Sequence, residues 1–375
     1  MMIVPGIMMP VTQVSISKHT LTSKHIIAMN KILNFLKNEF LGTPEYRMYS
    51  AMDKFARRIE KYKKKKMYEP LYNILLDTKK DEFLREMAAD ALGDIRDKNA
   101  VEALVLSLKI EYEKIEIWPS GILVDVLKAS ILALGKIGGT RGSEPLCKIL
   151  LDIKKDEYLR ELAANALGDI LDKNAVEALV LSLKIEYEKI EIWPDGYTLV
   201  DVLKASILAL GKIGDTRGSE PLCKILLDIK KDGYIRELAA NALGDIRDKN
   251  AIETLVLSLE TEKEEDVLIA SSKALAKIGD SRGVDYILHT LDGYYYARHK
   301  GVGALEEIGW KPTTEEEKEL YNSAKNSKMC YQCEKIFVGD GIRSAVNLTG
   351  DWGYFCSNAC DHKFEREMEQ WYDGK

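Results

Sequence analysis

The sequence has few of the residues on which enzymes and membrane proteins commonly depend. It contains five histidines in 375 residues, and it lacks a Ser-His-Asp order, a phosphate-cradling glycine loop and the helix motif of zinc hydrolases. No apolar run approaches the ~18 residues of a membrane span. The start, Met1–Val11, has neither the charged leader nor the small-residue cleavage site of a secretory signal. We therefore expect a cytoplasmic chain.

A long segment occurs twice in succession. Asp97–Pro119 recurs letter for letter as Asp172–Pro194, and Thr140–Asp156 recurs as Thr216–Asp232. Each copy splits again into two units, in which a small-residue helix is followed by a more aliphatic one. Such units cannot bury their apolar faces alone, so they stack on one another. The duplication predicts an all-α repeat solenoid.

These units resemble the HEAT-like repeats named after phycobilisome bilin lyases. The resemblance rests on an alanine-rich first helix that runs into Ala-Leu-Gly-Asp-Ile, followed by a Pro-Leu or Ala-Leu second helix, and it covers about Glu82–Leu291. The strip Ala304–Tyr321 is similar to the segment that often closes such a run. The resemblance implies a right-handed α-solenoid that binds other macromolecules. One scaffold hosts many roles, so the pattern specifies the fold more narrowly than the function.

The chain divides into four parts in this interpretation. We expect an N-terminal segment and helix at 1–42, a basic N-terminal repeat or cap at 43–81, the HEAT-like array with its tandem duplication at 82–327, and a zinc module at 328–375. Within the array, the Lys-Ile-Gly glycines should end helices, and the Asp-Lys-Asn turns should supply capping oxygens for the next helix.

Four of the six cysteines form a cluster with the spacing of zinc ligands: Cys330, Cys333, Cys356 and Cys360. Two thiolates around one tight turn and a second pair on the first turn of a helix can complete a tetrahedron around Zn²⁺. Four thiolates leave no open position, so this Zn²⁺ is expected to be structural and to supply folding energy. A redox or metal-sensing thiol cluster is the alternative. Cys147 and Cys223 lie among leucines at helical spacing and are expected to be small buried hydrophobes.

The cysteine cluster and its surroundings resemble a treble clef of the TRASH and MYM-type zinc modules. The resemblance spans Cys330–Lys375 and implies a small α+β module with a hairpin and a final helix. From Tyr331 to the end, five basic residues face eight acidic ones. Phosphate contacts need the opposite sign of charge, so we expect this module to contact protein and not nucleic acid.

An insertion repeated in both copies, Lys109–Pro119 and Lys184–Pro194, prolongs the second helix of its unit. Aromatic side chains presented at one regular spacing can anchor a protein partner. The partner-binding candidates here are Tyr112, Trp118, Tyr187 and Trp193. In the competing interpretation each insertion packs on its neighbour and the tryptophans are buried.

One region is basic. Between Thr43 and Tyr68, nine Lys or Arg stand against three acidic residues, in a chain whose net charge is −6. The candidate contacts in the 54–66 stretch are Arg57, Arg58, Lys61 and Lys65. Such asymmetry fits an acidic partner, an RNA or attraction to the acidic repeats, and it equally fits a solvated helix end.

Some proteins with such repeats are enzymes, and others are non-enzymatic scaffolds. Deoxyhypusine hydroxylases hold two irons with His-Glu dipeptides, which this chain lacks, and HEAT-like DNA glycosylases require a basic concave face. Bilin lyases position a chromophore for attachment to a partner's cysteine. We predict a non-enzymatic adaptor that binds proteins, with no catalytic and no organic-cofactor residues. The alternative is a repeat-protein enzyme, an oxidoreductase or bilin-lyase-like protein acting on a partner protein, or an RNA-binding repeat protein.

The zinc prediction has a direct test. Protein purified without chelators should contain one zinc per chain by elemental analysis, and the Cys330→Ser, Cys333→Ser variant should lose it, because a structural site with two ligands removed no longer holds the ion. A variant that keeps its full zinc content would show that these cysteines are not ligands.

Overall fold

The computed structural model describes residues 44–114, 125–154, 156–189, 201–230, 232–293, 295–329, 336–338, 342–346 and 352–355. The chain forms two compact units, Met1–Lys65 and Lys66–Lys375. In the first unit the structure describes helix α2 (Pro44–Lys64). The N-terminal helix predicted within residues 1–42 lies outside the described residues.

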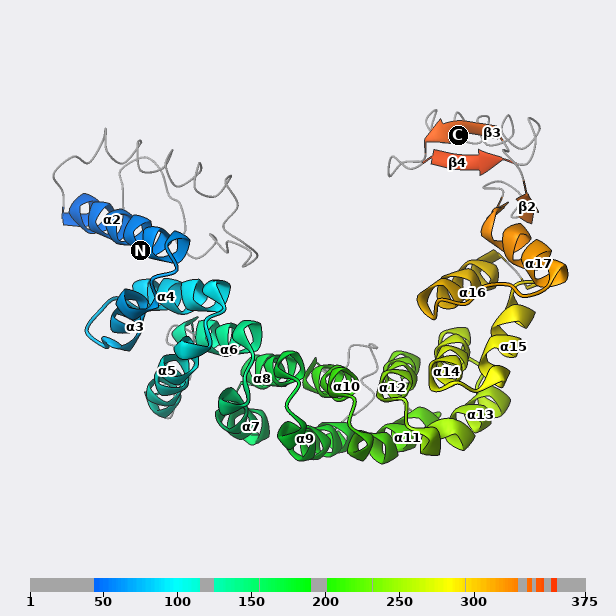
Figure 1. Cartoon of the computed structure of the whole chain (residues 1–375), viewed down its shortest axis with the longest axis horizontal. Coiled ribbons are helices and arrows are strands. Elements are labelled where there is room, and N and C mark those ends of the chain that lie inside the picture. The colour runs from blue at the N-terminus through cyan, green and yellow to red at the C-terminus, as the bar shows by residue number, and fades with distance from the viewer. Residues whose placement is uncertain are drawn as a thin grey trace, which may run out of the picture. The chain divides into compact units, whose positions relative to one another are not determined.

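The second unit is a stack of helix pairs arranged in two rows (Figure 1). The first helices of the pairs pack on one another along the inner side of the curve, and they are α4 (Glu82–Ile95), α6 (Asp125–Ile137), α8 (Glu157–Ile170), α10 (Asp201–Ile213), α12 (Gly233–Ile246), α14 (Glu265–Ile278) and α16 (Tyr295–Glu307). The second helices form the outer row, and they are α3 (Tyr68–Leu76), α5 (Val101–Lys114), α7 (Ser143–Leu151), α9 (Val176–Lys189), α11 (Ser219–Leu227), α13 (Ile252–Thr261) and α15 (Ser281–Thr290). This arrangement confirms the predicted all-α repeat solenoid.

The turns between helices follow the sequence pattern. Gly138, Gly214 and Gly279 adopt positive φ angles of 72°, 68° and 99° directly after α6, α10 and α14, where a glycine avoids the steric cost of that conformation. The Asp-Lys-Asn turns hold single turns of 3₁₀ helix, and Asp97 and Asp172 each accept a hydrogen bond from the backbone N–H two residues ahead. The local sequence therefore determines where each helix begins and ends.

Glycine and alanine set the spacing of the inner row. A Cβ atom at Gly93 would lie 2.8 Å from the Cα of Ala133, and one at Gly168 would lie 2.9 Å from the Cα of Ala209. Side chains essentially never approach a backbone so closely, so neighbouring first helices pack at a separation that only Gly against Ala permits. The Ala-Leu-Gly steps of the sequence are thus contact points between repeats.

A buried arginine ties together three helices in each copy. The Arg85 side chain is 1% exposed, donates from Nε to the carbonyl of Leu75 in α3 at 2.8 Å, and donates from a terminal nitrogen to Glu111 in α5 at 2.5 Å. Arg160 repeats both bonds with Leu150 at 2.9 Å and Glu186 at 2.6 Å. The carbonyls belong to the last turns of α3 and α7, which have no partners within their own helices.

The repeat that follows the duplication varies this arrangement. Arg236 occupies the equivalent place in α12 and forms ion pairs with Glu262 and Glu264, which lie between α13 and α14. Here α13 ends at Thr261, so its glutamate follows the helix instead of lying within it. The ion pair is kept although the helix is shorter and the long insertion is absent.

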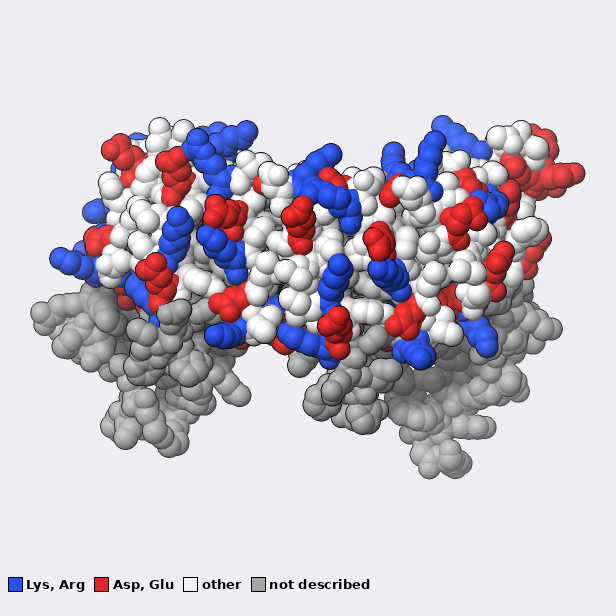
Figure 2. Space-filling view, turned by 90° about the horizontal axis from the view of Figure 1, so that it is seen from below, with Lys and Arg blue, Asp and Glu red and all other residues white. Residues whose placement is uncertain are grey.

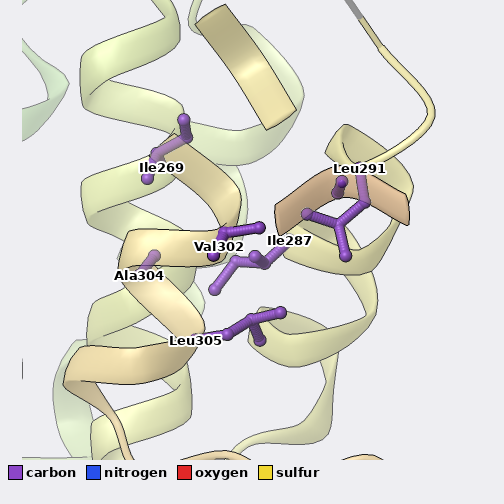
Figure 3. Packing of buried hydrophobic residues seen from close by; sticks show 7 residues of the cluster. Ile269, Ile287, Leu291, Val302, Ala304 and Leu305 are labelled. Carbon is purple, nitrogen blue, oxygen red and sulfur yellow. The ribbon is translucent and has the colours of Figure 1, made fainter. Parts of the chain in front are cut away.

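An apolar cluster closes the stack at its C-terminal end. Ile269 of α14, Ile287 and Leu291 at α15, and Val302 and Leu305 of α16 pack together (Figure 3). Helix α17 (Glu315–Lys325) follows and begins with a capping box between Thr314 and Glu317.

Beyond α17 the described residues form two antiparallel strand pairs. β1 (Ser327–Met329) pairs with β2 (Ile336–Val338), and β3 (Ile342–Val346) pairs with β4 (Trp352–Phe355). The four cysteines of the predicted zinc module lie outside the described residues. The zinc-bound α+β module therefore stays a prediction. Among the described helices, none combines the length and the apolarity that a membrane crossing requires.

Candidate functional site

The inner row of helices carries the same group of exposed and half-buried side chains twice. Inner set A consists of Lys128, Leu132 and Lys136 on α6 with Tyr158 on α8. Inner set B consists of Lys204, Leu208 and Lys212 on α10 with Tyr234 on α12. The positions i, i+4 and i+8 place the three α6 residues, and likewise the three α10 residues, in one column along the helix.

The two inner sets have nearly equal geometry. The Lys128 ammonium lies 5.0 Å from the centre of the Tyr158 ring, and that of Lys204 lies 5.1 Å from the centre of the Tyr234 ring. These cation–π contacts join neighbouring first helices. The leucines between the lysines are exposed, Leu132 by 42% and Leu208 by 45%. Each set thus offers an aromatic ring, an apolar side chain and an ammonium group on one surface.

The last lysine of each set, Lys136 or Lys212, takes part in a series of ion pairs between neighbouring first helices. Lys136 donates to Asp94 at 2.9 Å, Lys212 donates to Asp169 at 2.7 Å, and Lys277 donates to Asp245 at 2.8 Å. Each pair links one first helix to the next. Because these pairs are exposed to solvent, each contributes at most about 1 kcal/mol to stability.

The first lysine of each set, Lys128 or Lys204, lies farther from its acidic neighbour than the last lysine does. The Lys128 ammonium lies 3.8 Å from Asp125, and that of Lys204 lies 3.7 Å from Asp201. Both separations exceed the length of an N–H···O hydrogen bond, although the charges still attract. Glu161 lies close to Lys204 and Asp201, and burial raises its pKa, with a smaller contribution from Asp201. The sequence analysis missed these sets, whose signal was the Lys, Leu and Lys at i, i+4 and i+8 in a helix that is otherwise mostly buried.

The predicted aromatic anchors divide into two groups. Tyr112 donates its hydroxyl proton to Asp152 at 2.5 Å, and Tyr187 donates to Asp228 at 2.6 Å. Both tyrosines are half-buried, and each bond ties the end of α5 or α9 to the residue that follows α7 or α11. Trp118 and Trp193 lie outside the described residues. The described part of each insertion therefore packs on its own array, and partner binding through these aromatics stays a prediction.

On the part of the outer face that the structure describes, positive and negative side chains are mixed. In Figure 2, Lys and Arg lie interspersed with Asp and Glu across the row of second helices. Exposed leucines recur at equivalent places, Leu106 on α5, Leu181 on α9 and Leu257 on α13. A groove of about 530 Å³ between α7 and α9 is lined in part by Ser143, Cys147 and Leu181.

The two cysteines of the array are half-buried, so they are less enclosed than the sequence predicted. Burial, helped by the charges of Asp172 and Glu144, raises the pKa of the Cys147 thiol to about 11. Burial raises the pKa of the Cys223 thiol as well. Both thiols stay protonated near neutral pH and are poor nucleophiles.

The remaining predicted residues are placed as follows. Arg57, Arg58 and Lys61 on α2, and Lys65 just after it, are exposed, and Arg57 forms an ion pair with Asp53 at 2.8 Å. Across the described residues, no group of three or more His, Cys, Asp or Glu side chains could hold a metal ion. The zinc prediction rests on cysteines beyond them.

Comparison with known proteins identifies the repeats. Residues 219–306 match the HEAT repeat family, and residues 84–109 and 202–228 match the PBS lyase HEAT-like repeat family. The chain carries PBS lyase HEAT-like repeats. The bilin biosynthesis protein PecE of Mastigocladus laminosus is 31% identical over 125 residues, which are 31% of this chain and 46% of PecE. The chain thus spans about half the length of this relative.

Comparison with solved structures found two natural proteins. The complex of CpcE and CpcF of phycocyanin lyase from Nostoc overlaps with a TM-score of 0.41 at 23% identity, covering 69% of this chain and 94% of the other. Human deoxyhypusine hydroxylase overlaps with a TM-score of 0.31 at 19% identity, covering 68% of this chain and 90% of the other. Neither overlap is close enough to assign a function.

The prediction of a non-enzymatic adaptor is wrong. The match to PecE, a bilin biosynthesis protein, favours the bilin-lyase-like alternative instead. The error has a physical origin, because concentrated catalytic groups such as histidines are the clearest sign of an enzyme in a sequence, and this chain has few of them. A surface that holds a chromophore needs rings, aliphatic side chains and single charges, which are hard to distinguish from an ordinary solvated helix face.

The tyrosine bonds predict a dependence of stability on pH. Burial and the bond to Asp228 raise the pKa of Tyr187 above its ordinary value of 10.0. The folded residue keeps its proton where an unfolded tyrosine ionises, so its contribution is full below pH 10 and is lost as pH rises further. Tyr187→Phe should lower the free energy of unfolding by about 1–2 kcal/mol at pH 8, and by less at pH 11.

Denaturant unfolding at both pH values measures this difference. The matched control is Tyr158→Phe, since Tyr158 is exposed and its substitution should change stability little at either pH. Equal effects of the two substitutions would contradict the assignment of Tyr187 as a tie between repeats.

Proposed function

We propose that this chain is a bilin-handling protein of the lyase type, which binds a linear tetrapyrrole and presents it to a thiol of a partner protein. The observation that carries this proposal is the 31% identity with PecE over 125 residues. The matches to PBS lyase HEAT-like repeats within both copies of the duplication support it.

The inner row provides groups suited to such a ligand. A linear tetrapyrrole is a conjugated chain of pyrrole rings with two propionate groups. Tyr158 and Leu132 would contact the flat rings, as aromatic and aliphatic side chains do in ligand sites. Lys128 would meet a propionate with a charge-assisted hydrogen bond. Inner set B offers the same groups.

The attachment step needs no oxidant or reductant. The partner's sulfur forms a bond to one carbon of an exocyclic double bond of the bilin, and the thiol proton goes to the other carbon. In this proposal the chain's part is to hold the bilin in place and to leave it available for transfer. The raised pKa of Cys147 and Cys223 serves that part, because thiols that stay protonated do not trap the bilin on the array.

A structural zinc at Cys330, Cys333, Cys356 and Cys360 is retained as a separate proposal. It would stabilise the C-terminal segment and take no part in bilin chemistry.

The test of the proposed function is a spectroscopic titration. Biliverdin, a linear tetrapyrrole, is added to the full-length protein while the visible absorption and fluorescence are recorded. We expect a saturable change in the long-wavelength band, and release of the pigment when the protein is denatured, since binding without a partner is non-covalent. An engineered HEAT-repeat protein of unrelated sequence serves as control. A spectrum that stays that of free biliverdin at all ratios would contradict the proposal.

A further inference from the structure

The duplication has copied a complete set of ligand-binding groups and not half of one. Lys128, Leu132 and Tyr158 have their counterparts at Lys204, Leu208 and Tyr234, each 76 residues further along the chain. The lysine–ring distances of 5.0 Å and 5.1 Å agree. Equal chemistry at equal geometry implies nearly equal affinity for one ligand.

Each set is built from two consecutive first helices of its own. Set A uses α6 and α8, and set B uses α10 and α12. No residue belongs to both sets, so occupation of one does not remove a contact from the other. Both sets lie in the same row of one unit (Figure 1).

The series stops after two sets for a structural reason. In α14, Ile269 stands where α6 has Lys128 and α10 has Lys204. Ile269 is 8% exposed and packs into the C-terminal apolar cluster with Ile287 (Figure 3). In α14, which follows the duplication, this position is therefore part of the core. Among the described first helices from α6 to α14 the full set occurs twice.

The charges of each set fit a ligand with carboxylates. The first lysine of each set lies beyond hydrogen-bond distance of its aspartate, with Lys128 at 3.8 Å from Asp125 and Lys204 at 3.7 Å from Asp201. Its ammonium group therefore retains N–H donors for an anion. The last lysine of each set already donates a hydrogen bond, Lys136 to Asp94 and Lys212 to Asp169. One propionate per ligand would thus bind the first lysine of the set, while the tyrosine ring and the leucine contact the conjugated system.

We infer that the array binds two linear tetrapyrroles, one at inner set A and one at inner set B. This inference rests on the proposed function and adds its stoichiometry and its location. Two loaded positions on one chain would let a single protein hold two chromophores for a partner, a property that a single asymmetric pocket does not give.

The experiment is a titration of the full-length chain with biliverdin at a protein concentration well above the dissociation constant. The wild-type chain should saturate at two equivalents. The Lys128→Ala, Tyr158→Ala variant should saturate at one equivalent, and so should the Lys204→Ala, Tyr234→Ala variant. The variant that combines all four substitutions should lose binding at these concentrations.

The chain offers a matched control on the outer row. Lys148 and Lys224 are also counterparts across the duplication, and each forms an exposed ion pair, with Glu144 at 2.8 Å and Glu220 at 2.7 Å. Lys148→Ala, Lys224→Ala removes the same charge and should still saturate at two equivalents. Circular dichroism establishes that each variant is folded. Should a tyrosine variant fail to fold, the charge reversals Lys128→Glu and Lys204→Glu replace it, since these lysine side chains are partly exposed to solvent.

The possible outcomes separate the two proposals. Saturation of the wild-type chain at one equivalent would overturn this inference and leave the proposed function standing, with one ligand spanning both sets. Two equivalents that persist in the variant with four substitutions would overturn the location. Absence of any binding by the wild-type chain would overturn the proposed function and this inference together.

Discussion

The buried arginine of each copy is the interaction on which the array depends. Arg85 and Arg160 are each 1% exposed, and each joins the end of the preceding second helix to the second helix of its own unit. Removing one member of such a pair leaves an uncompensated buried charge, which costs about 3–5 kcal/mol. The arginine thus links each unit to the one before it. Its third version, with Glu262 and Glu264 around Arg236, keeps this role where the insertion is missing.

The same ion pair lies next to the tyrosine that holds each insertion on the array. Glu111 and Glu186 lie one residue before Tyr112 and Tyr187, so the arginine and the tyrosine hydrogen bonds together anchor the point where each insertion leaves its helix. On the opposite side, Gly135 packs against Ala166 and brings α6 close enough to α8 for Lys128 to reach Tyr158. Gly211 packs against Ala242 in the same way and brings α10 close enough to α12 for Lys204 to reach Tyr234. The close packing of the first helices therefore also positions the side chains of the candidate ligand surface.

The sequence predicted the fold well because its information is local and repeated. The Lys-Ile-Gly glycines, the Asp-Lys-Asn turns and the alanine-rich helices each act within a few residues, and the duplication states them twice. Long-range polar contacts were not predictable in this way. Arginine is most often exposed, so the equivalence of Arg85 and Arg160 gave no sign of burial. The hydrogen bond from Tyr112 to Asp152 joins residues 40 positions apart and forms only when the helices pack. The inner sets join residues from neighbouring helices, and nothing in Lys128 alone indicates the ring of Tyr158.

The central claim is that the buried arginine and glutamate act as one unit. The most direct measurement is a double-mutant cycle with Arg160→Met, Glu186→Met and the double variant, read by native-state hydrogen exchange over α8 and α9. The account predicts that each single substitution lowers local stability by about 3–5 kcal/mol. The double substitution should cost less than the sum, with a coupling energy of about 0.5–3 kcal/mol. Strictly additive losses, or an Arg160→Met variant as stable as the wild type, would contradict it.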